Sequence, residues 1–302
     1  KGNSECLPAD SNDAGNDCAF ERLTANFARD HVSGADDRSA EERWRQTRST
    51  YYRSLLTRGL IAYEASGRAA NPLMLGAIGS TDSHFGTPGR VQEQDYWGSM
   101  SMLWQEDEAR LANGGYNPGG LVAVWAPQNT RADVFDALKR REAYATSGPR
   151  ISLRFGLLDD HSPVADACAD GGAGFAVTMG GAMTRRDAAP RLQVIAGMDR
   201  TPLAKVEIVK VSLHDGEVFE SVHTLAEFAD GSPSVCRVWQ DPAFQSEMPA
   251  YYYARIQELP SPRWSRQLCE RLDRCEAHPE ADVAIQERAW SSPIWYEPGS
   301  GG

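Results

Sequence analysis

The chain of 302 residues is short of long apolar runs, of basic residues and of histidine. No apolar stretch approaches the roughly 18 residues that a membrane-spanning helix needs, so we expect no membrane span. Lys and Arg number 31 against 42 Asp and Glu, which gives a formal net charge of -11. Because nucleic-acid binding needs clustered basic residues, this balance argues against a nucleic-acid partner and leaves a small anionic substrate open.

Cysteine is also scarce, but its spacing is informative. Of the six Cys, Cys6 and Cys18 bracket a polar loop, and Cys269 and Cys275 bracket the sequence ERLDR. The spacings favour two local disulfides, and with them an oxidising compartment, periplasmic or secreted. The alternative is free thiols in a cytosolic enzyme. Zinc binding is disfavoured because neither pair has the short C-x-x-C spacing of zinc knuckles.

Helical and strand-like segments alternate in the first half of the chain. They are, in order, a helix from Ser39 to about Leu60, a strand at 73–78, a strand at 121–125, and a helix that starts at Thr130 and ends in Lys139-Arg140-Arg141. Ser39 and Thr130 are each followed three residues later by an acidic residue, as at capped helix starts. The alternation predicts an α/β fold for residues 1–149.

The second half has the period of two that is typical of half-buried strands. Ile151, Leu153, Phe155 and Leu157 alternate with smaller or polar residues, and further strands are expected at 191–198, 205–213 and 251–259. These segments predict an antiparallel β-sandwich over residues 150–297, followed by a flexible tail at 298–302.

Aromatic residues gather near the end of the chain, at Tyr251–Tyr253, Trp290, Trp295 and Tyr296. They are open to two interpretations, a sugar-binding surface or the core of the sandwich. The core interpretation is favoured because aromatic side chains at strand positions usually supply buried area.

The sequence GSTDSHFGTPG at 79–89 follows the predicted strand at 73–78. In an extended segment Asp82 and His84 point to the same side and present an oxygen and a nitrogen donor to one point. Mixed donors of this kind suit Zn, Mn or Fe. A surface turn is the alternative, since three-residue motifs occur by chance, and the chain offers no second obvious pair of ligands.

Four long stretches carry a resemblance to a known family. They are LGAIGSTDSHFGTPG, YNPGGLVAVWAPQNTRADVFDALKRREAYATSGPRI, AYYYARIQELPSPRWS and IQERAWSSPIWY. Together they resemble the uncharacterised family DUF3604, related to the PHP (polymerase and histidinol phosphatase) metal-dependent hydrolases. The resemblance extends over nearly the whole chain, from KGNSEC at 1–6 to Tyr296.

The resemblance implies a distorted (βα)7 barrel that holds two or three divalent metal ions (Zn, Mn or Fe). Asp82 and His84 match the last D-x-H motif of PHP sites, and Glu5 in KGNSEC would supply a further ligand or a supporting carboxylate. The H-x-H motif expected on the first strand is absent. We therefore expect a C-terminal portion of the barrel, completed by an N-terminal segment of the same protein or by a complementary chain.

Arg141 belongs to a stretch that resembles a late barrel strand of PHP enzymes, where an arginine would bind an anionic substrate group. The simpler interpretation is that Arg140 and Arg141 offset the dipole at the end of a helix. The expected function is hydrolysis, of a phosphate ester by analogy, through a metal-activated water. The alternative is a non-catalytic binding or structural protein built on a degenerate barrel.

Overall fold

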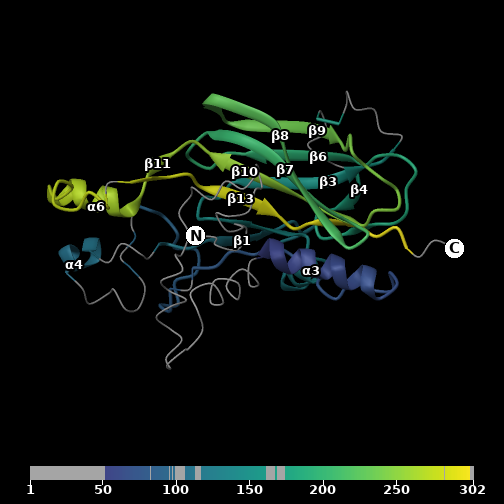
Figure 1. The fold of residues 1–302 in the computed structure, drawn as a ribbon. Helices are drawn as coiled ribbons and strands as arrows, with labels where there is room; N and C mark the ends of the chain where they lie inside the picture. Colours follow the sequence, from purple (N-terminus) through teal and green to yellow (C-terminus); the bar gives the residue numbers. More distant parts are fainter. Residues whose placement is uncertain are drawn as a thin grey trace, which may run out of the picture.

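The computed structural model describes residues 52–81, 83–94, 96, 98, 106–112, 117–160, 167–168, 174–281 and 283–299. These residues form three β-sheets and a small number of helices (Figure 1). Most strand pairs are antiparallel, and the two large sheets lie face to face. No helix in the described part of the chain is long and apolar enough to cross a membrane.

The largest sheet takes strands from both halves of the chain. Its eight strands are β1 (Leu121–Val124), β2 (Ala143–Thr146), β5 (Ala182–Met183), β7 (Leu203–His214), β8 (Glu217–Ser232), β10 (Ala250–Glu258), β13 (Arg288–Ser291) and β14 (Ile294–Tyr296). Strand β10 is central, because it pairs with β7 along one edge and with β13 and then β14 along the other. The pair β14–β5 is parallel.

The second sheet has four strands in the order β4 (Phe175–Thr178), β3 (Ser152–Leu158), β6 (Arg191–Gly197) and β9 (Ser234–Gln240). It packs on one face of the eight-stranded sheet, and apolar residues from both sheets form the main core, among them Phe155, Leu192, Val206, Tyr252 and Ile256. A short third sheet pairs β11 (Ser261–Pro262) with β12 (Ala284–Ile285).

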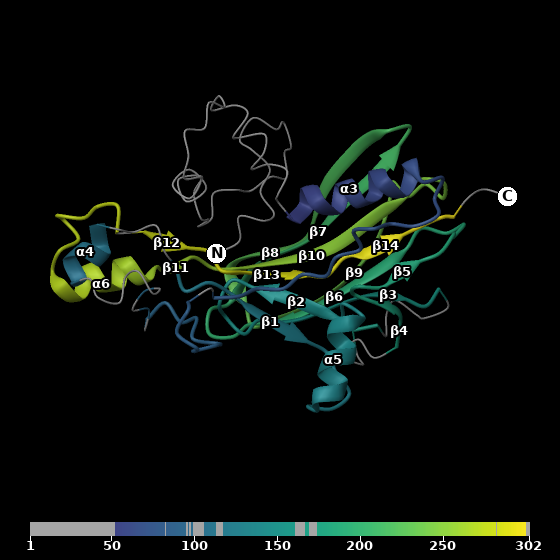
Figure 2. The ribbon, with the colours of Figure 1, turned by 90° about the horizontal axis from the view of Figure 1, so that it is seen from below.

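Helix α3 (Tyr52–Ala65) covers the opposite face of the eight-stranded sheet (Figure 2). Its Leu56 and Leu60 pack in one cluster with Tyr251, Tyr253 and Trp295. The core interpretation of the aromatic residues is therefore confirmed. Because both faces of the sheet are covered, β10 is buried over its whole length.

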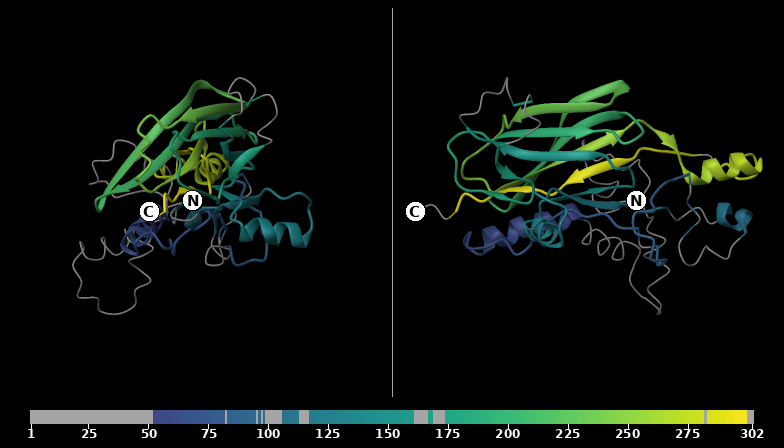
Figure 3. Two further views of the ribbon diagram at one scale, coloured as in Figure 1. Left: turned by 90° about the vertical axis from the view of Figure 1, so that its right-hand side faces the viewer. Right: turned by 180° about the vertical axis from the view of Figure 1, so that it is seen from behind.

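Helix α5 (Arg131–Lys139) connects β1 to β2 and starts where the sequence predicted. The Thr130 hydroxyl accepts from the Asp133 N at 3.2 Å and caps the helix. Two short helices, α4 (Asp107–Ala112) and α6 (Trp264–Leu272), pack together at one end of the molecule, away from α3 and α5 (Figure 2 and Figure 3).

Replacing Thr130 with alanine should lower the free energy of unfolding by about 1 kcal/mol, because the first turn of α5 loses its side-chain acceptor. Urea unfolding monitored by circular dichroism measures the change. A serine at the same position keeps a hydroxyl and should restore most of the stability. Equal loss in both variants would contradict the capping role.

The predicted α/β fold with part of a (βα)7 barrel is wrong, because the described residues form mostly antiparallel sheets and no barrel. Two local features explain the error. Residues 73–78 form no strand; they cross the sheet face, where the Ala77 N donates to the Ser292 hydroxyl at 2.9 Å. In addition, α5 leads from β1 into an antiparallel partner, β2, instead of a parallel one.

Several individual elements were predicted correctly. The strands expected at 191–198, 205–213 and 251–259 are β6, β7 and β10, each within two residues. The helix expected to end near Leu60 continues as α3 to Ala65, and its predicted start at 39–51 lies outside the described residues. The domain boundary near residue 150 stays a prediction; β2, before it, and β13, after it, pair within one sheet.

Candidate functional site

A group of buried polar side chains lies at one end of the eight-stranded sheet and is called here the charged cluster. Arg255 on β10 is directly opposite Glu207 on β7, and Gln257 on β10 is opposite Arg288 on β13. The Arg255 Nε donates to Glu207 Oε2 at 2.6 Å, and the Gln257 Nε2 donates to the same oxygen at 3.1 Å. All four side chains are buried, so the charges of Arg255 and Glu207 compensate each other inside the protein.

The charged cluster shares a sheet face with the aromatic residues under α3. Tyr253, Arg255 and Gln257 alternate along β10 and therefore point to the same side. Arg53, at the start of α3, donates its Nε to the Tyr253 hydroxyl at 3.1 Å. The face therefore changes from aromatic to charged just beyond the first turn of α3.

Further buried polar groups join the ends of β2, β10 and β13 beside the charged cluster. The Ser147 hydroxyl donates to the Glu287 carboxylate and accepts from the Arg288 N at 2.8 Å. The Glu258 N donates to the Glu287 carbonyl at 2.9 Å. Since Ser147, Glu258 and Glu287 are all buried, this end of the sheet holds a concentration of carboxylate and guanidinium groups.

The segment that precedes His84 reaches the same end of the sheet. Gly79 lies directly on the sheet backbone, since a Cβ there would be 2.5 Å from the Leu121 carbonyl oxygen. Further along, Glu93 accepts from the Trp264 N at 2.6 Å. Gly79 therefore lies at the start of β1 and the end of β2, and Glu93 lies at the start of α6.

His84 is exposed, and its backbone is in the left-handed region with φ of 61°. The extended geometry assumed for residues 82–84 is therefore wrong at His84. Asp82 and Glu5 lie outside the described residues. Within the part of the chain that the structure describes, no group of three or more His, Cys, Asp or Glu side chains is placed to hold a metal ion. The three ligand assignments stay predictions.

Arg141 precedes β2 and Ser147 follows it, so the two residues flank opposite ends of this strand. Its Nε donates to the Gly180 carbonyl at 3.0 Å, and its φ is 62°. Burial raises the pKa of the Glu297 carboxyl, and the charge of Arg141 opposes that rise. The structure thus brings Arg141 together with residues around Gly180, and not with His84.

A buried ion pair between the two large sheets was missed from the sequence. The Lys210 Nζ lies 2.6 Å from Asp241 Oδ2, and the Tyr252 hydroxyl donates to the same oxygen at 2.8 Å. The Ala243 N donates to Asp241 Oδ1 at 3.0 Å, while its carbonyl accepts from the Lys210 Nζ. Burial, and then the Asp241 charge, raise the pKa of Tyr252 well above its ordinary value. The feature of the sequence that could have indicated this ion pair is Lys210, a lysine within the otherwise mostly apolar predicted strand 205–213.

Two disulfides are present in the described residues. Cys269–Cys275 confirms one predicted pair, and Cys168–Cys236 joins residues that no local spacing connects. The predicted pair Cys6 and Cys18 lies outside the described residues. The two disulfides indicate an oxidising, extracytoplasmic compartment.

The sequence matches the family model described as a protein of unknown function (DUF3604), over residues 1–230 and 226–298. The two matches together cover nearly the whole chain. A search of curated proteins finds no match. The chemistry of the site therefore rests on its own residues.

Proposed function

This chain belongs to the DUF3604 family, and we propose that it is a metal-dependent hydrolase acting on a small anionic substrate, a phosphate ester. Asp82 and His84 would hold the metal, with Glu5 as a further ligand or a supporting carboxylate. Two carboxylates and an imidazole are a donor set that suits Zn, Mn or Fe. Such a metal supplies Lewis-acid activation of a water for attack on the ester.

The observation that carries the proposal is the position of the segment around His84. Gly79, five residues before His84, lies against the start of β1 and the end of β2, next to Ser147 and its partner Glu287. Buried ionic groups cost desolvation free energy, and packed apolar residues would often serve stability as well or better. Their concentration at the end of the sheet that Gly79 contacts, close in sequence to Asp82 and His84, favours a chemical role for this end.

The chain's own residues would hold the turn in place. Gly79 allows the segment to lie on the sheet backbone, and the Glu93 carboxylate anchors its far end to the start of α6. Arg141 is not included in this site, because it contacts Gly180 at the other end of β2. Its predicted role in binding an anionic group stays a separate prediction.

We also propose that other residues complete the metal site, from a preceding segment of the same protein or from a complementary chain. The support is the small number of candidate ligands in the present sequence. A periplasmic or secreted location, the finer form of the extracytoplasmic assignment, belongs to the same proposal.

The proposal predicts bound Zn, Mn or Fe in the protein expressed from its complete native gene. Replacing Asp82 or His84 with alanine should lower the metal content, measured by elemental analysis, and phosphoesterase activity by about tenfold or more. The matched control is His214→Ala, since His214 is an exposed histidine at the turn between β7 and β8.

Absence of metal from the complete protein, with Asp82→Ala equal to the parent across a panel of phosphomonoesters and phosphodiesters, would reject the hydrolase. That result would favour the alternative, a non-catalytic binding or structural protein.

A further inference from the structure

Helices α4 and α6 form a small unit of their own beside the sheets. Leu111 of α4 packs with Trp264 and Leu268 of α6, and all three are buried. Arg110 of α4 lies over the Trp264 ring, and Tyr96 packs against the same ring with the ring centroids 5.2 Å apart. Through the Trp264 ring, the unit therefore also holds Tyr96, which follows His84 in the sequence.

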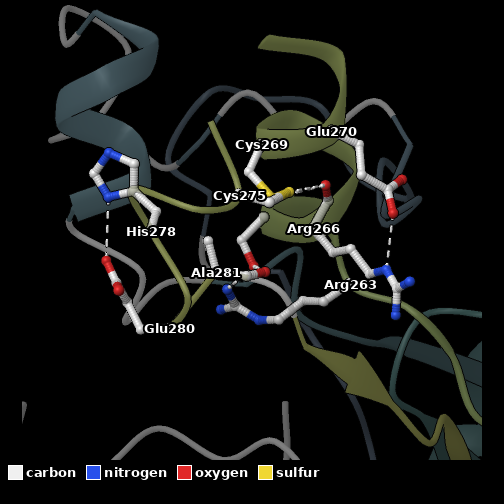
Figure 4. The surroundings of a disulfide bond; sticks show 9 residues. Arg263, Arg266, Cys269, Glu270, Cys275, His278, Glu280 and Ala281 are labelled. Atoms are coloured by element: carbon white, nitrogen blue, oxygen red, sulfur yellow. Dashed lines mark hydrogen bonds and ion pairs between the residues drawn. A yellow bond between two sulfur atoms is a disulfide. The ribbon is translucent and has the colours of Figure 1, made fainter. Parts of the chain in front are cut away.

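The turn after α6 is held by a disulfide (Figure 4). Cys269 is buried in the last turns of α6 and is bonded to Cys275. The His278 N then donates to the Arg274 carbonyl at 3.1 Å, and the Ala281 N donates to the His278 carbonyl at 2.9 Å. The backbone that carries His278 is fixed from both sides.

Both ring nitrogens of His278 contact carboxylates. The His278 Nε2 lies 2.9 Å from Glu108 Oε1, and the Nδ1 lies 3.2 Å from Glu280 Oε1. An ionised carboxylate only accepts hydrogen bonds, and a neutral imidazole has a single N–H. Only the protonated imidazole donates both bonds at once. Figure 4 shows the ring of His278 and its contact with Glu280.

The two carboxylates beside this ring favour its protonated form. The hydrogen bond to Glu108, followed by that to Glu280, raises the pKa of His278 above its ordinary value of 6.5. The hydrogen bond from His278 lowers the pKa of Glu108. Arg274 approaches Glu108 at 3.8 Å, and Arg110 pairs with Asp107 on α4 itself. Glu108 and Glu280 remain about half exposed, so water screens both pairs.

We propose that His278 is a pH-sensitive latch that holds α4 against the disulfide-bonded turn after α6. The ion pair between His278 and Glu108 joins two residues that are 170 positions apart in the sequence. Below about pH 6.5 the imidazole is protonated whether or not it is latched, and the latch is fully closed. As the pH rises through the raised pKa of latched His278, the ring loses its positive charge and one of its two N–H donors. Its attraction for Glu108 then weakens, and α4 loosens.

In an extracytoplasmic protein the latch would respond to a change of external pH near neutrality, because histidine is the side chain that titrates in that range. Loosening of α4 would release Arg110 from the Trp264 ring, against which Tyr96 also packs. The inference does not rest on the proposed hydrolase, since its readouts are titration and amide exchange and not activity.

The first test is an NMR titration of His278 in the parent and in E108Q/E280Q. We expect the pKa of His278 to lie above 6.5 in the parent and to fall to or below that value in the double variant, in which both ring nitrogens lose a carboxylate. The matched control is E276Q, which removes a carboxylate close in sequence and should leave the pKa unchanged. An equal pKa in the parent and in the double variant overturns the latch.

The second test is hydrogen exchange of residues 107–112 at pH 6 and pH 8.5, expressed as protection factors to remove the intrinsic effect of pH. Protection of α4 in the parent should fall by about two- to fivefold at the higher pH, the range for an exposed ion pair. In H278Q it should be low and equal at both values of pH. Constant protection of α4 in the parent would also overturn the proposal, even if the variants do not fold.

Discussion

Replacing Lys210 with methionine is expected to lower the free energy of unfolding by about 3 to 5 kcal/mol. The variant keeps the length of the side chain and removes its charge, so the Asp241 carboxyl is left fully buried between the two sheets without its cation. The remaining donors to that carboxylate, the Tyr252 hydroxyl and the Ala243 N, do not replace a full positive charge. Equilibrium unfolding in urea measures the loss.

The same strand supplies a matched control. Lys205 on β7 pairs with Glu227 at 3.2 Å, but here the lysine is partly exposed and the carboxylate is mostly exposed. Lys205→Met should therefore cost less than about 1 kcal/mol. The double variant Lys210→Met/Asp241→Leu should recover part of the stability, because it removes the uncompensated charge. If the two single lysine variants lose equal stability, burial of the Lys210–Asp241 pair has no energetic importance.

Replacing Gly79 with alanine is expected to cost about 3 kcal/mol, toward the upper end for overpacking. The new Cβ would lie 2.5 Å from the Leu121 carbonyl oxygen and 2.8 Å from the Thr146 carbonyl oxygen. Both contacts are with backbone of paired strands, which cannot move aside without breaking the pairing of β1 and β2. We also expect the segment carrying His84 to lift from the sheet, and the proposed metal site would then bind its metal more weakly.

Gly197→Ala is the control for Gly79→Ala. Its Cβ would meet only the Ser152 hydroxyl, at 2.8 Å, and that exposed side chain can turn away with the loss of one long hydrogen bond, 3.5 Å, to the Gly197 carbonyl. A loss within about 0.5 kcal/mol is expected there. Thermal unfolding separates the two variants, and equal melting temperatures would show that the segment is not fixed by its contact with the sheet.

Local chemistry made some elements of the fold predictable. The alternation from Ile151 to Leu157 matches β3, and the Thr130 cap matches the start of α5. Cys269 and Cys275 are close enough in sequence for their spacing to indicate the bond. In each case the deciding interactions lie within a few residues of one another.

Features decided by distant contacts were not predictable. Residues 73–78 are as apolar as a strand, but they lie on a sheet that already has its strands, with the Ala77 N bonded to the side chain of Ser292. Cys168 and Cys236 are separated by 68 residues, so their spacing carries no information. The α/β error arose because alternating helices and strands do not determine whether neighbouring strands are parallel.

The same distinction between local and distant interactions applies to the candidate site. His84 was identified from a short motif, but its left-handed backbone depends on the turn in which it lies. The charged cluster depends on the register of β7, β10 and β13, which places Glu207 opposite Arg255 and Gln257 opposite Arg288. Register between strands so far apart in the chain has no local sequence signal.

The pairing of β10 with two successive short strands, β13 and β14, has a consequence for the order of folding. Residues 288–296 join β10 to the antiparallel pair of β1 and β2 on one side and to β5 on the other. During synthesis the largest sheet therefore stays open until these late residues have left the ribosome. Such long-range closure slows folding and exposes the unpaired edge of β10 for as long as it is delayed.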